Sequence, residues 1–403
     1  MKRILVIAST FPASDNDPVP AFVKDQIIAL KQLKPEFEFT VLAPHDKRSN
    51  TESFTKQDAY NEYRFHYFWP FSVEKLAGRG IMPALKASPL NYFIVPFLFI
   101  GEFMALLRVT IKLKPDILYA HWFTPQAVVA RWVGALTATP FVFTTHALDV
   151  NVWHKIPIIG TLVVRGAARK AQAFTAVSMR SMARLEQFFP PGEWSTLKKR
   201  GTVIPMGVNL PSQDVYKHPK GQTILFMGRL AEKKGVQYLI KAFGEIIEKY
   251  PEAKLVIAGD GPLKKDLQKQ ARNIENVDFT GFISGEKKHL LLRSSKLYVV
   301  PSIIASDGDV EGLPVSLMEG LAYGKVCIAT NESGADDILT NRKDGFLVPQ
   351  KDVSALAEAL ERGLALSKSD YGTVSREARR TAAQFAWPHV AKQHNDFLFR
   401  HRP

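Results

Sequence analysis

Short runs of apolar and β-branched residues alternate along the chain with longer segments in which apolar residues recur at helical spacing. This alternation is typical of βαβ units, which build parallel sheets covered by helices on both faces. The first half contains six expected strands, at residues 4–8, 39–43, 117–120, 141–145, 173–176 and 202–204. The second half contains six more, at residues 223–227, 255–258, 277–280, 297–300, 327–330 and 346–348. We therefore expect an α/β fold with two parallel sheets.

Residues 205–221 are rich in Pro, Gly and polar side chains and indicate a linker between the two halves. A chain of 403 residues also exceeds the size at which one hydrophobic core usually stops growing. We expect two Rossmann-like, doubly wound domains, 1–208 and 209–386, which face each other across a cleft. Residues 387–403 begin with a helix start at Trp387-Pro388 and could cap the second domain or cross back to the first. Ligands of such sheets bind at the carboxyl ends of the strands, so the cleft is the expected site.

The longest apolar region runs from Tyr92 to Leu107. Pro96, Gly101 and Glu102 interrupt it before it reaches the roughly 20 residues that a membrane span needs. We therefore expect no transmembrane helix here. Two interpretations stay open, namely a helix packed on a sheet and a contact with a membrane surface.

The charge is strongly basic and unevenly distributed. The chain carries +14 overall, and residues 1–210 hold 25 basic and 15 acidic residues, a net +10. An anionic partner such as a phospholipid surface or a phosphate-bearing substrate would fit the first half. Nucleic acid would also fit, but no zinc-finger, helix-turn-helix or RNA-recognition signature is present, so we expect none.

Two features point to a cytosolic location. Cys327 is the one cysteine and lies in an apolar run, which excludes an internal disulfide and favours a buried thiol in a reducing compartment. The N-terminal apolar run, residues 4–8, is too short for a signal peptide and is better explained as a first buried strand.

Two glutamates, Glu311 and Glu319, follow the expected strand 297–300. Between them, Pro314 lies at or near the start of a helix, where its missing N–H is harmless. The first free amides of this helix belong to Gly312, Leu313 and Val315. Such amides can bind a diphosphate, while a glutamate on either side accepts hydrogen bonds from hydroxyls, as a nucleotide-sugar would offer them. The alternative is that both glutamates are merely solvated loop and helix residues.

A basic turn follows the expected strand 223–227. Gly228 and Arg229 lie at the carboxyl end of that strand, and Lys233-Lys234 lie at the entry to the next helix. Guanidinium and ammonium groups at this position can neutralise a leaving diphosphate. The alternative is a solvated basic turn without function.

Four segments in order, "GRLAEKKG", "IAGDGPLKKDL", "TGFIS" and "EGLPVSLMEGLAYG", resemble family 4 of the retaining glycosyltransferases. In the first half, "FVKDQIIAL", "KPDILYAHWFTPQ", "FVFTTHALDV", "FTAVS" and "VIPMGVN" are similar to its exopolysaccharide and lipid-linked glycan branch. The resemblance covers nearly the whole chain and implies the two-domain GT-B fold.

The resemblance implies roles for residues of the second half. Arg229 and Lys234 would bind the donor diphosphate and stabilise it as it leaves. Glu311 would contact the transferred sugar, and Glu319 the ribose hydroxyls. The remaining expected donor contacts are Gly228, the amides of Gly312 and Leu313 at the phosphate, and Phe282 and Ile283 along the base.

In the first half, His121 and His146 both fall at carboxyl ends of expected strands. Either could contact hydroxyls of the donor sugar, and His146 is expected nearest the reacting carbon. Asp149, three residues further on, is expected to contact sugar or acceptor.

The implied reaction moves a hexosyl or N-acetylhexosaminyl unit from a UDP- or GDP-linked donor to a glycan or polyprenyl-phosphate-linked acceptor, with retention. No carboxylate pair is placed as in glycosidases. The resemblance implies instead a same-face displacement in which the leaving phosphate helps to accept the acceptor's proton. The acceptor would meet the aromatic stretch Tyr63 to Phe71 at the inner membrane face. No cofactor is expected. Asp307-Gly308-Asp309 resembles a metal-binding DxD motif, but its place in the glutamate loop argues against a metal.

Three other functions remain as alternatives. A nucleotide-sugar epimerase could use the same scaffold, and a non-catalytic glycan- or membrane-binding protein could keep it without turnover. A nicotinamide-dependent oxidoreductase would need G-x-G-x-x-G after the first strand, where this chain reads "STFPASDNDP".

Overall fold

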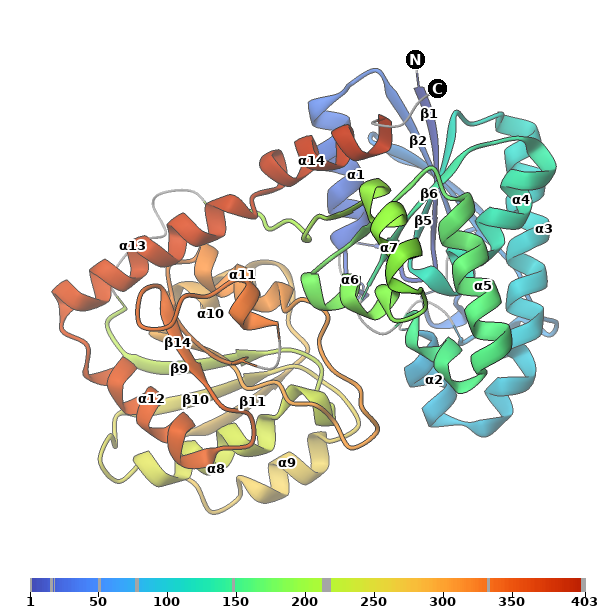
Figure 1. Ribbon diagram of the computed structural model, residues 1–403. Helices are drawn as coiled ribbons and strands as arrows, with labels where there is room; N and C mark the ends of the chain where they lie inside the picture. Colours follow the sequence, from blue (N-terminus) through green and yellow to red (C-terminus); the bar gives the residue numbers. More distant parts are fainter. Residues whose placement is uncertain are drawn as a thin grey trace. The chain divides into compact units, whose positions relative to one another are not determined.

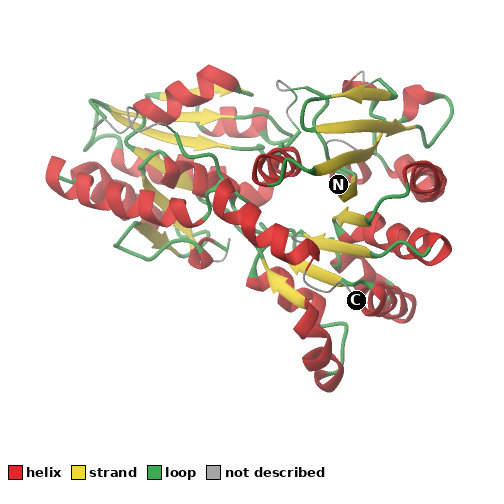
Figure 2. Ribbon diagram, turned by 90° about the horizontal axis from the view of Figure 1, so that it is seen from above, coloured by secondary structure: helices red, strands yellow, loops and turns green. Residues whose placement is uncertain are grey.

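The computed structural model describes residues 2–14, 17, 19–49, 52–76, 80–146, 149–211, 219–331 and 334–399. The chain divides into two compact units, one formed by Met1–Pro205 with Trp387–Pro403 and the other by Met206–Ala386 (Figure 1). Within each unit, helices flank a central sheet (Figure 2). The fold class expected from the sequence is therefore confirmed.

The first unit is built on a sheet in the order β3-β4-β2-β1-β5-β6-β7-β8. All pairs along it are parallel except β3 with β4. The strands are β1 (Lys2–Ala8), β2 (Phe37–Pro44), β3 (Phe54–Lys56), β4 (Tyr60–Phe65), β5 (Ile117–His121), β6 (Phe141–Thr145), β7 (Ala173–Ala176) and β8 (Gly201–Val203). The helices are α1 (Phe22–Leu33), α2 (Ile81–Ala87), α3 (Val95–Leu113), α4 (Val128–Thr137), α5 (Pro157–Lys170), α6 (Met179–Glu186), α7 (Pro191–Leu197) and the final α14 (Trp387–Phe399).

The second unit holds a fully parallel sheet in the order β11-β10-β9-β12-β13-β14. The strands are β9 (Gln222–Met227), β10 (Ala253–Ala258), β11 (Val277–Gly281), β12 (Leu297–Val300), β13 (Val326–Thr330) and β14 (Gly345–Val348). The helices are α8 (Val236–Ile246), α9 (Lys264–Gln270), α10 (Gly285–Ser294), α11 (Val315–Ala322), α12 (Val353–Ala365) and α13 (Lys368–Gln384). Cys327 on β13 is fully buried, as expected, and burial raises the pKa of its thiol.

All twelve strands expected from apolar runs are present, but two strands of the first sheet were missed. The strand β4 escapes the apolar pattern because it carries Glu62 and Arg64, which are both buried. Arg64 donates to the Glu62 carboxylate and, at 3.0 Å, to the carbonyl of Phe11. A buried ion pair thus stands where a core strand normally has apolar side chains.

The last helix, α14, packs on the first unit rather than capping the second. It lies against α1, and its Val390 and Phe397 are buried in the same core as the first strands. His394 lies 3.3 Å from the hydroxyl of Tyr119 on β5. The sequence left two positions open for residues 387–403, and in the structure this segment returns to the first unit.

Pro96, Gly101 and Glu102 do not interrupt the apolar segment, contrary to expectation. A 3₁₀ turn (Pro89–Ile94) leads directly into α3, and Pro96 lies in its first turn, where proline is tolerated. A Cβ on Gly101 would lie 2.9 Å from that of Tyr67, so glycine allows α3 to pass close to the loop after β4. Residues 89–113 are long and apolar enough to cross a membrane by length and composition, but one face of α3 packs into the core through Leu98 and Leu106.

Glu102 on α3 provides a test of the core. Its carboxyl is buried and accepts one hydrogen bond, 3.1 Å long, from the Gln126 amide, and burial raises its pKa to about 8. A raised pKa stabilises the native state below the unfolded pKa of 4.5, and this contribution is lost as the pH rises towards 8. The loss is roughly 1.4 kcal/mol per pH unit.

We therefore expect Glu102→Gln to raise the melting temperature by about 5 °C or more at pH 8 and much less at pH 5. Glutamine keeps the shape of the protonated acid without its ionisation. Melting curves at both pH values check this, with Gln126→Glu as a comparison that should destabilise. Equal shifts at the two pH values would show that Glu102 is not held neutral.

Candidate active site

The strand order reverses at one point in each sheet. In the second unit the chain begins at β9, builds outwards through β10 and β11, and then returns to β12 on the other side. The first unit has the same reversal between β1 and β5. Loops diverge at such points beyond the carboxyl ends of the strands, which leaves space for a ligand. The expected site residues lie close to these two points.

The basic turn after β9 is held in position by close packing. Its residues Glu232–Lys234 form a 3₁₀ turn that enters α8 through Gly235. Gly235 has φ +64°, and a Cβ there would lie 1.8 Å from the carbonyl oxygen of Pro301. Only glycine allows the start of α8 to approach the loop after β12 this closely.

Ion pairs join the basic turn after β9 to the loop that carries Glu311. Lys234 Nζ lies 3.2 Å from Glu311 Oε2, and Lys233 Nζ lies 3.7 Å from Glu311 Oε1. Lys233 also donates to Asp309 at 3.2 Å. Burial favours the neutral form of Glu311, but the two lysines outweigh it and hold its pKa below the ordinary value. A carboxylate and two ammonium groups are therefore charged together at the carboxyl ends of β9 and β12.

Further contacts fix the loop that carries Glu311. The Ile303 amide donates to the carbonyl of Lys233 at 2.8 Å. Ser306 donates to Glu232 through its amide at 2.8 Å and its hydroxyl at 2.9 Å. The basic turn thus organises the glutamate loop, which the spacing along the sequence could not reveal.

Pro314 lies directly before α11, where the sequence places it. The amide of Val315 donates to the carbonyl of Leu313 at 3.0 Å, so it is not free to bind a phosphate as expected. The amides of Gly312 and Leu313 have no hydrogen-bond acceptor among the described residues. Two of the three expected amides therefore remain available.

Glu319 lies in the second turn of α11 and is about one quarter exposed. Lys288 on α10 donates to it at 2.6 Å. This lysine was missed at the sequence level, because nothing in "SGEKKHLLLRS" distinguishes it from the other basic residues of a solvated helix.

The other expected donor contacts lie along the same edge of the sheet. Arg229 is exposed directly after β9. A Cβ on Gly228 would lie 3.3 Å from the ring carbon Cζ of Phe226, so Gly228 packs closely on that ring. Phe282 is half exposed and Ile283 half buried, both between β11 and α10. These residues stand on the loops after β9 and β11, on either side of the loop after β10.

The loop after β10, "AGDGP", also takes part in this edge. A Cβ on Gly259 would lie 1.8 Å from the carbonyl oxygen of Gly228, and one on Gly261 would lie 2.4 Å from that of Leu230. Both glycines have positive φ, 151° and 159°. They let this loop press directly on the turn that carries Arg229.

In the first unit, His121 and His146 lie together as expected from their strands. His121 Nδ1 is 3.3 Å from His146 Nε2. His146 also contacts the rings of Phe22 and Trp122, with centroids at 5.3 and 4.7 Å. His394 of α14 completes a buried cluster that no sequence pattern indicated.

All three imidazoles are uncharged at neutral pH. Burial, reinforced by the neighbouring imidazoles, lowers the pKa of His121 well below its ordinary value. Burial likewise lowers the pKa of His146 and that of His394 to about 3. His146 can therefore exchange hydrogen bonds with a sugar hydroxyl, but it brings no positive charge to the site.

Asp149 is engaged by its own loop. Its carboxylate accepts from the amides of Phe123 at 2.6 Å and His146 at 2.9 Å, and from the Thr145 hydroxyl at 2.5 Å. Burial raises its pKa to about 6 despite these bonds. These bonds tie Asp149 to the backbone of His146, and its expected contact with sugar or acceptor stays a prediction.

The aromatic stretch Tyr63 to Phe71 has both buried and exposed parts. Phe65 and Tyr67 are core residues, whereas Trp69 is 80% and Phe71 48% exposed. Glu74 holds this loop in place, because its carboxylate accepts hydrogen bonds from His45 Nδ1 at 2.6 Å and from His66 Nδ1 at 2.8 Å. Among the described residues this trio is the group whose ligand atoms lie near enough to hold a metal ion. The trio belongs to the first unit, whereas Asp307 and Asp309, the DxD pair for which the sequence argues against a metal, belong to the second.

Solved structures with the same fold cover almost the whole chain. A sucrose-phosphate synthase from Thermosynechococcus elongatus superimposes with a TM-score of 0.75 at 20% identity, over 99% of this chain and 98% of that one. Anabaena HepE in complex with UDP superimposes with a TM-score of 0.68 at 17% identity, over 99% of each chain. The two α/β units, each built on a largely or fully parallel sheet, have the GT-B fold of these structures.

Family models match both units. The model described as glycosyltransferase family 4 matches residues 29–211, and that described as glycosyl transferases group 1 matches residues 212–380. The chain therefore belongs to the family 4, group 1 glycosyltransferases, and its donor is a nucleotide-sugar.

Curated relatives come from several polysaccharide and glycolipid systems. The putative teichuronic acid biosynthesis glycosyltransferase TuaC of Bacillus subtilis is 26% identical over 89% of this chain and 88% of its own. The putative colanic acid biosynthesis glycosyltransferase WcaL of Escherichia coli is 27% identical over 68% of this chain and 67% of its own. A GDP-mannose-dependent phosphatidylinositol monomannoside mannosyltransferase of Mycobacterium tuberculosis is 26% identical over 69% of this chain and 74% of its own.

Proposed function

We propose that this protein transfers a hexosyl or N-acetylhexosaminyl unit, with retention, from a UDP- or GDP-linked donor to a glycan or lipid-linked hydroxyl. The observation that carries the proposal is the Lys234–Glu311 pair, 3.2 Å apart at the switch point of the second sheet. It puts a cation for the leaving diphosphate next to a carboxylate for sugar hydroxyls.

The residues of this chain would divide the work as follows. Arg229 and Lys234 bind the diphosphate and neutralise the charge that develops as it leaves. The amides of Gly312 and Leu313 donate to phosphate oxygens, and Glu311 exchanges Lys234 for a hydroxyl of the sugar while Lys233 keeps its charge balanced. His146, neutral and held by Asp149, hydrogen-bonds the sugar near its reacting carbon.

We place the product in cell-surface polysaccharide or glycolipid synthesis. TuaC and WcaL support this by name, as does the mycobacterial mannosyltransferase, and UDP and GDP both occur among the related donors. An acceptor of this kind is held at a membrane, so we expect a cytoplasmic protein that works peripherally at the inner membrane face. The basic charge of the first half, +10 over residues 1–210, supports an anionic surface as partner.

A thermal-shift titration with UDP, GDP, ADP and NAD tests the donor site. A ligand that binds only the native state increases the free energy of unfolding, by about 2.7 kcal/mol at 100 times its Kd, and so raises the melting temperature. We expect a shift with UDP or GDP in the wild type and its loss in Glu319→Ala, because the ribose contact is removed. Glu286→Ala, an exposed carboxylate at the start of α10, is the matched control and should keep the shift.

The opposite results would count against the proposal. A shift with NAD alone would favour the oxidoreductase alternative. An unchanged shift in Glu319→Ala would mean that this carboxylate does not hold the ribose.

A further inference from the structure

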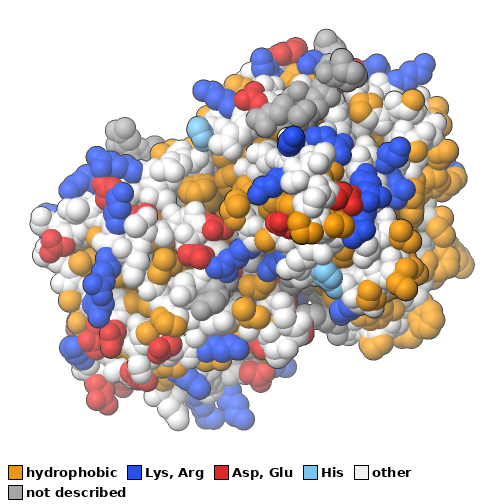
Figure 3. Space-filling view, viewed as in Figure 1, with side chains coloured by type: hydrophobic (Ala, Val, Ile, Leu, Met, Phe, Trp, Pro, Cys, Tyr) orange, Lys and Arg blue, Asp and Glu red, His pale blue; other side chains and the backbone are white. Residues whose placement is uncertain are grey.

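The helices α3, α4 and α5, with the 3₁₀ turn (Pro89–Ile94) before α3, cover one face of the first sheet and expose apolar side chains outwards. The most exposed include Phe93 at 76%, Ile100 at 60%, Leu136 at 66%, Ile158 at 80% and Leu162 at 68%. We call these five residues with Trp132 the apolar face. Figure 3 shows hydrophobic side chains gathered along the edge of the molecule where Figure 1 has these helices. Exposed apolar residues gathered in this way mark an interaction surface, whereas scattered ones are ordinary.

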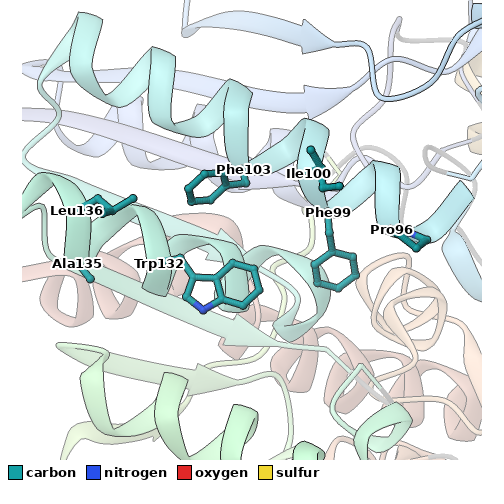
Figure 4. Close-up of a pocket in the computed structure, with 7 residues that line it drawn as sticks. All are labelled: Pro96, Phe99, Ile100, Phe103, Trp132, Ala135 and Leu136. Carbon is teal, nitrogen blue, oxygen red and sulfur yellow. The ribbon is translucent and has the colours of Figure 1, made fainter.

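A groove between α3 and α4 runs into the apolar face. Its volume is about 760 Å³, and its lining consists of apolar residues throughout. Phe99 and Phe103 of α3 and Trp132 of α4 lie around its middle, with Leu136 at one end (Figure 4). A glycan or a polar peptide would find no side-chain hydrogen-bonding partner there beyond the Trp132 indole, whereas hydrocarbon needs none.

The exposed charged side chains carried by these helices themselves are basic. Glu102 is the one carboxyl residue between residues 89 and 115, and it is buried, while Arg108, Lys112 and Lys114 are exposed. Neither α4 nor α5 contains an aspartate or glutamate. Each basic residue near an anionic membrane surface adds about 1 kcal/mol of attraction, so apolar and basic groups here favour the same partner.

We propose that the apolar face is inserted into the acyl-chain boundary of an anionic lipid bilayer, with hydrocarbon chains filling the α3–α4 groove. Helix α3 lies in the plane of the surface rather than across it. Its inner face is committed to the core, where Leu98, Leu106 and Glu102 are fully or almost fully buried. Crossing the bilayer would expose that core and its carboxyl group to lipid.

The proposal rests on the proposed function only in the reason for being at a membrane, which is a lipid-linked acceptor. The binding itself needs no nucleotide. It is therefore measured on the protein alone, by co-sedimentation with vesicles of phosphatidylcholine with and without phosphatidylglycerol, at low and high salt.

We expect binding to the anionic vesicles that persists in part at high salt, because the apolar contribution is not screened. The triple variant Phe93→Ser/Leu136→Ser/Ile158→Ser should lower the partition coefficient at least about tenfold, since burying even one such side chain is worth more than a factor of ten. Met179→Ser on α6, 58% exposed, is the matched control and should bind like the wild type. Arg108→Gln/Lys112→Gln/Lys114→Gln should weaken binding to anionic vesicles and leave zwitterionic vesicles unaffected.

Trp132 reports the depth of insertion. Its indole is 43% exposed and lies in the groove, so lipids brominated on the acyl chains should quench its fluorescence. The part of the quenching due to this residue should disappear in Trp132→Phe. Equal quenching in wild type and Trp132→Phe would contradict a groove filled by hydrocarbon.

Three outcomes would overturn the proposal. Binding that vanishes at high salt and is unchanged in the serine variant would be purely electrostatic. No binding to any vesicle would exclude the bilayer as partner, and a concentration-dependent dimer broken by the serine variant would assign the apolar face to a second copy. Because UDP and GDP shifts are measured separately, a failed membrane test leaves the transferase proposal standing, and the reverse also holds.

Discussion

Lys234→Ala is expected to lower turnover by roughly two to three orders of magnitude, the scale of losing one preorganised electrostatic donor. The ammonium group lies 3.2 Å from Glu311 at the switch point, where a leaving diphosphate would gather charge. Glu311 keeps Lys233 at 3.7 Å as a partner, so the variant should remain folded. Steady-state transfer or donor hydrolysis, with a melting curve for each variant, measures the effect.

Two comparisons sharpen this test. Lys234→Arg keeps the positive charge and should therefore recover part of the turnover that Lys234→Ala loses. If Lys234 had only a structural role, turnover would not depend on this charge. Lys233→Ala removes the neighbouring lysine, whose closer partner is Asp309 at 3.2 Å, and should cost less. Near-normal turnover in Lys234→Ala would remove the main support for the proposed donor site.

Glu311→Gln should also lower turnover, by about 100-fold or more, while nucleoside diphosphate binding is kept. On our proposal this carboxylate contacts the transferred sugar and not the nucleotide, so the loss appears in turnover and not in the UDP or GDP thermal shift. Glu319→Ala should give the opposite pattern, because removing the ribose contact abolishes the UDP or GDP thermal shift. Running both variants through both measurements separates the two glutamates.

Asp309→Asn is the matched control for Glu311→Gln. Asp309 also pairs with Lys233 and stands two residues earlier in the same loop. Its neutralisation should have a small effect, because no sugar contact is assigned to it. If the two variants lose turnover equally, the Glu311 effect would come from the lysine network and not from the sugar.

Much of the fold could be predicted because parallel strands are buried on both faces. Twelve apolar runs became the twelve strands expected from them. Two strands were missed: β3 at the edge of the first sheet, where polar residues are tolerated, and β4 next to it, which is paired on both sides. On β4, Glu62 and Arg64 neutralise each other inside the protein, and no period of hydrophobicity reveals such a pair.

The parts of the proposed donor site could be picked out in the sequence, but the contacts between them could not. Glycine, lysine and glutamate spacings located the turn after β9 and the loop after β12 separately. Their joining by Lys234 and Glu311 depends on β9 and β12 being neighbours in the sheet, although about 70 residues separate them in the sequence. The same holds for Lys288, which is a solvated lysine by sequence and a partner of Glu319 by packing.

By itself, the sequence determined the class of fold, the two halves, and the residues for which we propose contact with a diphosphate, because these depend on local periodicity and short motifs. Only the tertiary structure decided that α14 returns to the first unit, that His394 joins His121 and His146 in a buried neutral cluster, and that α3 shows an apolar side to solvent. Burial and pairing arise between segments far apart in the chain. They set the charge of the histidines and the outer surface of α3, and no local pattern carries that information.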